Sequence, residues 1–194
     1  MSRKDKTEQI SAVYDDEQQV KKKKKGERGV YNYLSKVLDM LFIGIDPGKN
    51  GGIAVLDENI RIVALSKMPD TPQDLLCFLS EIKFDKCMCM LERVGGMPGN
   101  GGNAMFNFGK GYGHLEMALL AHNITTETVT PNKWEKFFQL GSSGKYSKTE
   151  WKNKLKAKAQ QLFPSLGKKI TLATCDALLI AYYAANRQTH ELNG

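Results

Sequence analysis

Apolar residues in the middle of the chain form short runs separated by turn-forming residues. The first run, LFIGID at 41–46, ends in an aspartate and is followed by PGKNGG, which is typical of a tight turn. Two further runs, GIAVLD at 52–57 and IRIVALSK at 60–67, are separated by the turn residues DENI. Short turns between consecutive strands favour antiparallel pairing. The pattern therefore predicts a meander of three antiparallel strands.

A helix and a fourth strand are predicted next. The segment TPQDLLCFLSEI predicts a helix over 71–82, with Thr71 as the N-cap and Pro72 as the first helical residue. KCMCMLE at 86–92 predicts a strand that ends in a glutamate. Glycines are frequent over 95–113, and we interpret this segment as a long loop.

The remaining elements are mainly helical. In order they are a helix near 112–122, a strand at 125–130, a helix from Pro131 to about Leu140 with Thr130 as its N-cap, a flexible break at 141–147, a basic helix at 148–163 and a last helix containing CDALLIAYY. Strands reached through helical crossovers pair in parallel. We therefore predict the α/β class, with a mixed five-stranded sheet of three antiparallel and then parallel strands, flanked by helices.

The last predicted helix carries a carboxylate on its apolar face. Asp176 shares one face with residues 179, 180 and 183, which are all apolar or aromatic. A buried carboxylate is costly unless a cation or a hydrogen-bond donor meets it. The partner of Asp176 therefore bears on the function of the protein.

Two more carboxylates end predicted strands. Asp46 closes the first strand and Glu92 the fourth, and neighbouring parallel strands bring their carboxyl ends to the sheet edge where α/β proteins bind ligands. A last helix that crosses this edge would add Asp176. Clustered carboxylates repel one another unless a cation is present, and all-oxygen ligands suit Mg²⁺ or Mn²⁺. We therefore predict these three acids as catalytic ligands of two ions that cleave a phosphodiester.

Each acid also has an ordinary structural explanation. These alternatives are a turn position for Asp46, an ion pair with Arg93 or a lysine for Glu92, and capping by Thr171 or Thr174 for Asp176.

The length and the terminal sequences limit the organisation of the chain. Its 194 residues suffice for one domain and an extension. No apolar run could span a bilayer, and MSRKDKTEQ lacks an apolar signal core. We predict no membrane association and an intracellular protein. The predicted parts are a basic flexible arm with a short helix near its end at 1–40, a nuclease domain at 41–188 and a tail at 189–194.

Positive charge is concentrated in one segment. Ten lysines and two glutamates between residues 132 and 170 give it a charge of +8, whereas the whole chain carries +7. Such asymmetry is typical of a surface that contacts phosphates, although a solvated amphipathic face is the alternative. Two phenylalanines of the glycine-rich segment could stack on unpaired bases or act as a wedge in nucleic acid, or could anchor the segment in the core. The predicted DNA-binding residues are Phe106, Phe108, Lys110, Lys133, Lys145, Lys148, Lys152 and Lys156.

Several quoted segments resemble one nuclease family. FIGIDPGKNGGIAVLD, LERVGGMPGNGGNAMFNFGKGYGHLEMAL, TPNKWEKFFQLG, KLKAKAQQLFP and CDALLIAYYA occur in the order seen in RuvC-like Holliday junction resolvases, of the ribonuclease H-like superfamily. The chain is most similar to the branch found in phages and related to the plant organellar resolvase, over about 41–185. The resemblance implies a homodimer that cuts four-way DNA junctions with Mg²⁺ or Mn²⁺. It also implies the cytoplasm of a bacterial or phage-infected cell, with an organelle or the nucleus left open. It maps the acids of the family onto Asp46, Glu92 and Asp176, and its phosphate-binding lysine onto Lys145 or Lys148.

One position departs from the family. The resemblance implies a fourth ligand, Asp or His, about one helical turn before Asp176, but the chain has Thr171, Leu172 and Ala173 there. Two functions therefore stay open: a crossover junction endonuclease, and a junction-binding protein with weak or no cleavage. The sequence leaves the choice between recombination, repair and phage DNA processing open as well.

Overall fold

The computed structural model describes residues 40–82, 86–95 and 101–191. Apart from Met40, the predicted basic N-terminal arm with its short helix lies outside these residues, as does part of the glycine-rich segment. Within the described ranges, no helix combines the length and the apolar character needed to cross a membrane.

One mixed sheet of five strands organises the described residues, in the order β3-β2-β1-β4-β5. The strands are β1 (Met40–Asp46), β2 (Gly52–Leu56), β3 (Ile62–Lys67), β4 (Lys86–Glu92) and β5 (Thr125–Val129). The first three pair antiparallel, whereas β4 pairs in parallel with both β1 and β5. The predicted α/β class and the predicted mixed sheet are therefore confirmed.

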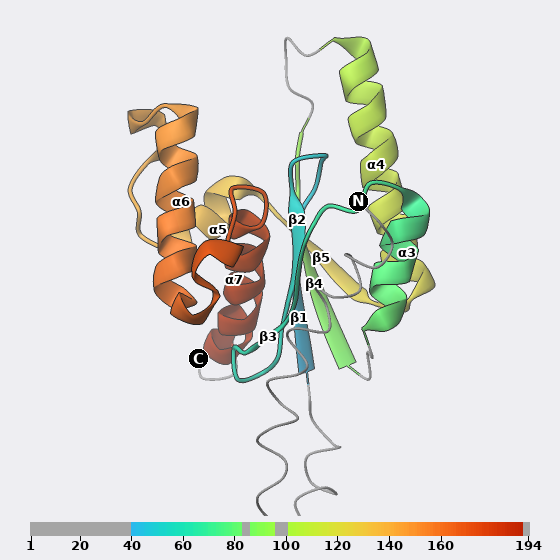
Figure 1. Ribbon diagram of the computed structural model, residues 1–194, viewed down its shortest axis with the longest axis horizontal. Coiled ribbons are helices and arrows are strands. Elements are labelled where there is room, and N and C mark those ends of the chain that lie inside the picture. Colours follow the sequence, from blue (N-terminus) through green and yellow to red (C-terminus); the bar gives the residue numbers. More distant parts are fainter. Residues whose placement is uncertain (1–39, 83–85, 96–100, 192–194) are drawn as a thin grey trace, which may run out of the picture. The chain divides into compact units, whose positions relative to one another are not determined.

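Helices cover both faces of this sheet (Figure 1). They are α3 (Pro72–Glu81), α4 (Gly102–Ala121), α5 (Pro131–Phe137), α6 (Lys148–Leu162) and α7 (Cys175–Glu191), with short 3-10 turns η1 (Ser143–Lys145) and η2 (Pro164–Lys169). One apolar core lies between the sheet and α3 and α4, and a second lies between the sheet and α5, α6 and α7. Side chains that alternate along β1 enter the two cores in turn, as the period of a strand requires.

Polar residues at the starts of two helices fix where those helices begin. Thr71 caps α3 as predicted, because its hydroxyl accepts a hydrogen bond from the Asp74 amide at 3.1 Å. Ser147 and Glu150 form a reciprocal capping box at the start of α6. Helix α5 begins at Pro131 as predicted, but the Thr130 side chain makes no capping hydrogen bond.

Helix α4 begins ten residues earlier than the sequence pattern predicts. We expected a loop over 95–113, whereas residues 102–113 are helical and carry Phe106, Phe108 and Lys110. A glycine costs a helix only about 1 kcal/mol relative to alanine, so the glycines weaken this helix without ending it. The buried residues of α4, namely Leu115, Ala118 and Leu119, lie in its second half and hold it against the sheet.

Helix α7 packs along the strands whose ends carry the candidate acids. Ala177, Leu178, Ala181 and Ala184 are fully buried against the sheet, and small residues let the helix backbone approach β1 closely. The helix continues to Glu191, past the predicted domain end at residue 188. Its first turn, which contains Asp176, therefore has a fixed position relative to β1.

Candidate functional site

Three buried carboxylates meet at one edge of the sheet. Asp46 is the last residue of β1, Glu92 is the last residue of β4, and these parallel neighbours end side by side because Ile45 pairs with Leu91. Asp176 enters from the first turn of α7. The exposed fractions of the three acids are only 9%, 8% and 7%. Burial raises the pKa of both strand-end acids, and electrostatic repulsion within the group raises it further, so the three charges act on one another.

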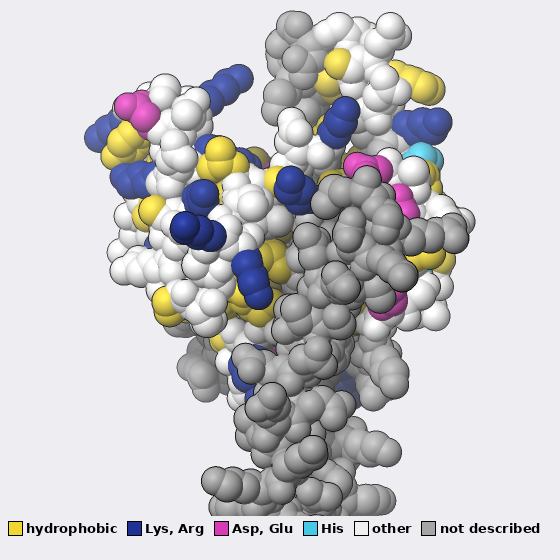
Figure 2. Space-filling view, viewed as in Figure 1, with side chains coloured by type: hydrophobic (Ala, Val, Ile, Leu, Met, Phe, Trp, Pro, Cys, Tyr) yellow, Lys and Arg dark blue, Asp and Glu magenta, His cyan; other side chains and the backbone are white. Residues whose placement is uncertain are grey.

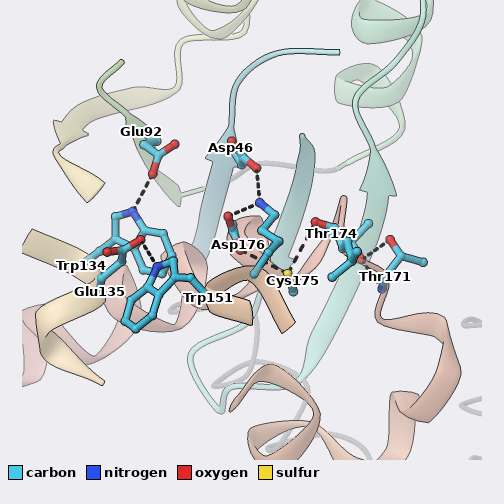
Figure 3. Close-up of polar contacts among 11 residues, drawn as sticks. Asp46, Glu92, Trp134, Glu135, Trp151, Thr171, Thr174, Cys175 and Asp176 are labelled. Atoms are coloured by element: carbon cyan, nitrogen blue, oxygen red, sulfur yellow. Dashed lines mark hydrogen bonds and ion pairs between the residues drawn. The ribbon is translucent and has the colours of Figure 1, made fainter. Parts of the chain in front are cut away.

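Lys152 of α6 supplies a cation to two of these acids. Its ammonium forms an ion pair with Asp176 Oδ2 and lies 3.6 Å from Asp46 Oδ2 (Figure 3). The sequence pattern placed Lys152 among the DNA-binding lysines of the basic helix. In the structure its side chain lies between two of the predicted metal ligands, which answers what the buried Asp176 meets.

Glu92 is held by a different partner. The indole Nε1–H of Trp134 donates a hydrogen bond to Glu92 Oε1 at 2.8 Å, and both side chains are buried. A second pair of the same chemistry lies nearby, where Trp151 Nε1–H donates to Glu135 Oε1 at 2.9 Å (Figure 3). The sequence pattern did not identify either tryptophan as the partner of an acid. The general rule that a buried indole N–H needs an acceptor was the available signal, but it does not name the acceptor.

Burial and repulsion raise the pKa of two carboxyl groups. For Asp46 the pKa rises to about 6, chiefly through burial and then through the charge of Asp176, although Lys152 opposes the shift. For Glu92 it rises to about 8, through burial and then the charge of Asp46, against the hydrogen bond from Trp134. One ammonium therefore does not fully compensate the negative charge at this edge.

The charge of Lys152 is correspondingly stabilised. Burial alone would lower the pKa of its ammonium, but the charges of Asp176 and Asp46 outweigh burial and raise that pKa above its ordinary value. An ammonium that stays protonated between two carboxylates occupies a place suited to a cation.

The donor set fits a hard divalent cation. Carboxylate oxygens are the ligands that Mg²⁺ and Mn²⁺ prefer, and Asp46, Glu92 and Asp176 offer them from three separate elements. In the described part of the chain, however, no group of three or more His, Cys, Asp and Glu side chains is already gathered as a metal site. The position of Lys152 between two of the acids is one physical reason. Metal binding at this edge would require its ammonium to move away.

The segment before Asp176 adds no further carboxylate or imidazole. The Thr174 hydroxyl accepts a hydrogen bond from the Thr171 amide at 3.0 Å, and the two threonine hydroxyls lie 3.1 Å apart. The alternative in which these threonines cap Asp176 is therefore not what the structure shows. Asp176 Oδ1 instead lies 3.2 Å from the Cys175 thiol, which donates to it. Leu172, one of the three residues at the expected position of the fourth ligand, is apolar and 42% exposed.

The other predicted DNA-binding residues lie in two separate helical layers. On α4, Phe106 is 70% exposed, whereas Phe108 is half-buried beside Tyr112, with ring centres 6.3 Å apart. Figure 2 shows Lys and Arg side chains over the layer of α5, α6 and α7, and a notch between the upper ends of the two layers. Lys110, Lys133, Lys145 and Lys148 are exposed, and Lys156 is half-buried.

Comparisons with known proteins identify the fold. No protein-family profile matches the chain, and no curated protein matches it in sequence. Among the solved structures that match are Thermus thermophilus RuvC in complex with a Holliday junction substrate, at 14% sequence identity and a TM-score of 0.56, and RuvC of the same organism, at 15% identity and a TM-score of 0.54. The alignments cover 77% and 78% of this chain and 96% and 97% of RuvC. The described chain therefore has the ribonuclease H-like fold of RuvC.

Proposed function

We propose that this protein is a metal-dependent endonuclease that resolves four-way DNA junctions. The observation that carries the proposal is the meeting of Asp46, Glu92 and Asp176, buried at the carboxyl ends of β1 and β4, with a residual negative charge. The similarity in fold to RuvC, which was solved with a Holliday junction substrate, supports the choice of substrate.

The three acids would hold two Mg²⁺ or Mn²⁺ ions. When bound, such ions activate a water molecule and stabilise the leaving oxygen of a phosphodiester. The residues of the chain contribute in other ways: β1, β4 and α7 hold the three ligands at a buried edge of the sheet, and Trp134 holds one oxygen of Glu92. Once displaced from Asp46 and Asp176, the ammonium of Lys152 would be free to pair with a DNA phosphate.

The DNA would lie along the edge between the two helical layers. The lysines on the α5–α7 side supply positive charge for the backbone, since Lys133, Lys145 and Lys148 are exposed. On the other side, the exposed ring of Phe106 and the charge of Lys110 extend from α4. An exposed aromatic ring is suited to stack on an unpaired base at a junction.

A homodimer is part of the proposal. In the second half of α4, the side chains of Met117 and Leu120 are 63% and 68% exposed and lie three residues apart, so they share one helical face. An apolar helical face of this kind is suited to contact a second copy of the chain. Two copies would present two carboxylate sites to the two strands of a symmetric junction.

Cleavage of a synthetic four-way junction tests this function. We expect the wild-type protein with Mg²⁺ or Mn²⁺ to release nicked duplexes, and Asp46→Asn to lose cleavage while it still binds the junction. A linear duplex of the same sequence serves as the substrate control. Equal cleavage by wild-type protein and Asp46→Asn would show that the carboxylate site is not responsible.

A second function is favoured by the segment before Asp176. Thr171, Leu172 and Ala173 provide no carboxylate or imidazole there, so metal occupancy would be weaker than in a four-ligand site. Under this alternative the protein binds branched DNA tightly, with strong salt dependence, and leaves it intact. Ala173→Asp would then raise both Mn²⁺ affinity and cleavage several-fold, whereas an already efficient enzyme would gain little.

A further inference from the structure

The hydrogen bond between Trp134 and Glu92 has well-defined geometry and little freedom to change. The Trp134 side chain is 1% exposed, and its ring packs edge-on against Phe138 with ring centres 6.3 Å apart. Its Nε1–H has one proton to donate and donates it to Glu92 Oε1 at 2.8 Å. Loss of this bond would leave a buried donor unpaired, which is costly. The indole therefore holds Oε1 in place.

This contact makes the two oxygens of the Glu92 carboxylate inequivalent. The hydrogen bond from the indole occupies one lone pair of Oε1 and fixes its direction, so Oε2 is the oxygen more available to a bound cation. The distinction matters because cations differ in how they use a carboxylate. Ca²⁺ accepts both oxygens of one carboxylate in a large and flexible shell, whereas Mg²⁺ demands near-ideal octahedral geometry.

We infer that Trp134 is a positioning residue that restricts Glu92 to donating one oxygen to a metal ion, and that it thereby favours Mg²⁺ and Mn²⁺ over Ca²⁺. This inference rests on the proposed function, since it requires Glu92 to be a metal ligand. It adds a determinant of metal selectivity that lies outside the ligand set itself.

The chain contains a matched control for the experiment. Trp151 makes the same kind of bond to Glu135, at 2.9 Å, and Glu135 is not among the three acids at the sheet edge. Trp134→Phe and Trp151→Phe each keep a large aromatic ring and remove one indole N–H. A general effect of losing a tryptophan would appear in both variants, whereas the proposed effect belongs to Trp134→Phe alone.

Binding of Mg²⁺, Mn²⁺ and Ca²⁺ to the full chain without DNA provides the test, by calorimetric titration or by NMR where binding is weak. We expect Trp134→Phe to reduce the preference for Mg²⁺ over Ca²⁺ about tenfold, the scale of change found when outer hydrogen-bond partners of metal ligands are removed. Trp151→Phe should keep the wild-type preference. An unchanged preference in Trp134→Phe, or an equal change in both variants, would overturn the inference.

A measurement on the wild-type protein decides the question if Trp134→Phe does not fold. The chain has two tryptophans, so its indole N–H groups give two NMR signals, and Trp151→Phe assigns them. We expect the Trp134 N–H to keep slow exchange with solvent during Mg²⁺ titration, because its bond to Oε1 persists. Faster exchange on metal binding would refute the inference. Absence of any metal binding, or binding unchanged in Asp46→Asn, would instead refute the metal site and the proposed function with it.

Discussion

Gly44 of β1 lies directly against Ala177 of α7: a Cβ atom placed on the glycine would be 2.2 Å from the Ala177 carbonyl oxygen, and equally close to the Ala181 amide nitrogen. Both neighbours are backbone atoms of a buried helix, so they cannot turn aside as a flexible side chain would. The contact sets how closely α7, and with it Asp176, approaches β1.

Gly44→Ala should destabilise the protein by about 3 kcal/mol, the upper part of the usual range for overpacking a core. Urea unfolding would measure this change. Gly111→Ala is the control, since a Cβ atom at Gly111 meets nothing within 4 Å and alanine favours the helix by about 1 kcal/mol. If the two variants were equally stable, the proposed role of the close approach would be wrong.

Lys152→Met should make the protein depend on metal for its stability. Without the ammonium, Asp46 and Asp176 repel each other across a buried edge, and the melting temperature of the metal-free protein should fall. Added Mg²⁺ should then raise the melting temperature more than it does in wild-type protein, because the ion no longer competes with Lys152. Lys156→Met, one helical turn further along α6, should behave like wild type. An equal response to Mg²⁺ in Lys152→Met and wild type would contradict competition for the same place.

The stability of the metal-free protein should fall as pH rises from about 4 to about 8. The folded state raises the pKa of Asp46 from 3.8 to about 6 and that of Glu92 from 4.5 to about 8. In this window the folded protein binds more protons than the unfolded chain, so its free energy of unfolding decreases with increasing pH. Chemical denaturation at several pH values in the presence of a chelator measures the trend.

The double variant Asp46→Asn, Glu92→Gln provides the control for this pH dependence, since it removes both titrating groups and should flatten the profile. Saturating Mg²⁺ should also oppose the decline, because metal ligands bind in their deprotonated form. A wild-type profile that rises between pH 4 and 8 without metal would contradict the raised pKa values.

Substitution of the exposed apolar face of α4 should prevent dimer formation. Met117→Glu combined with Leu120→Glu places two charges where the proposed partner would be apolar, and like charges would face each other across a symmetric contact. Analytical ultracentrifugation should show a monomer with unchanged helix content. Leu172→Glu, at an exposed leucine outside α4, should leave the dimer intact. A monomeric wild-type protein at the concentrations used for cleavage would refute the dimer proposal.

Salt dependence should identify the lysines that contact DNA. Each phosphate contact contributes about 0.9 to the slope of log affinity against log salt, so Lys145→Gln and Lys148→Gln should each lower the slope for junction binding by about that amount. Lys86→Gln is the matched control, because Lys86 is also exposed but lies at the opposite end of β4 from Glu92. Equal slopes for all three variants and the wild type would show that neither Lys145 nor Lys148 contacts a DNA phosphate.

The fold and the three acids were predictable because both depend on regular patterns. Alternating and continuous apolar runs gave the strands, and the position of Asp46 and Glu92 at strand ends followed from the sheet order. The start of α4 was not predictable, since its glycines have a low helix propensity. Only the packing of the second half of the helix outweighs this cost.

The partners of the acids could not be predicted from the sequence either. Lys152 is one of ten lysines in the basic segment, and nothing in the local pattern separates it from Lys148 or Lys156. Only the packing of α6 beside α7 selects it. Likewise, 42 positions separate Trp134 from Glu92, so their hydrogen bond is a consequence of tertiary structure.

The place of Asp176 on the last described helix has a consequence for biosynthesis. A growing chain that has released β1 to β5 already contains Asp46 and Glu92, but not the third acid. Until α7 emerges from the ribosome and docks, one face of the sheet also lacks its main apolar cover. The proposed cutting activity therefore requires α7, because a chain that stops before this helix lacks the third acid of the site.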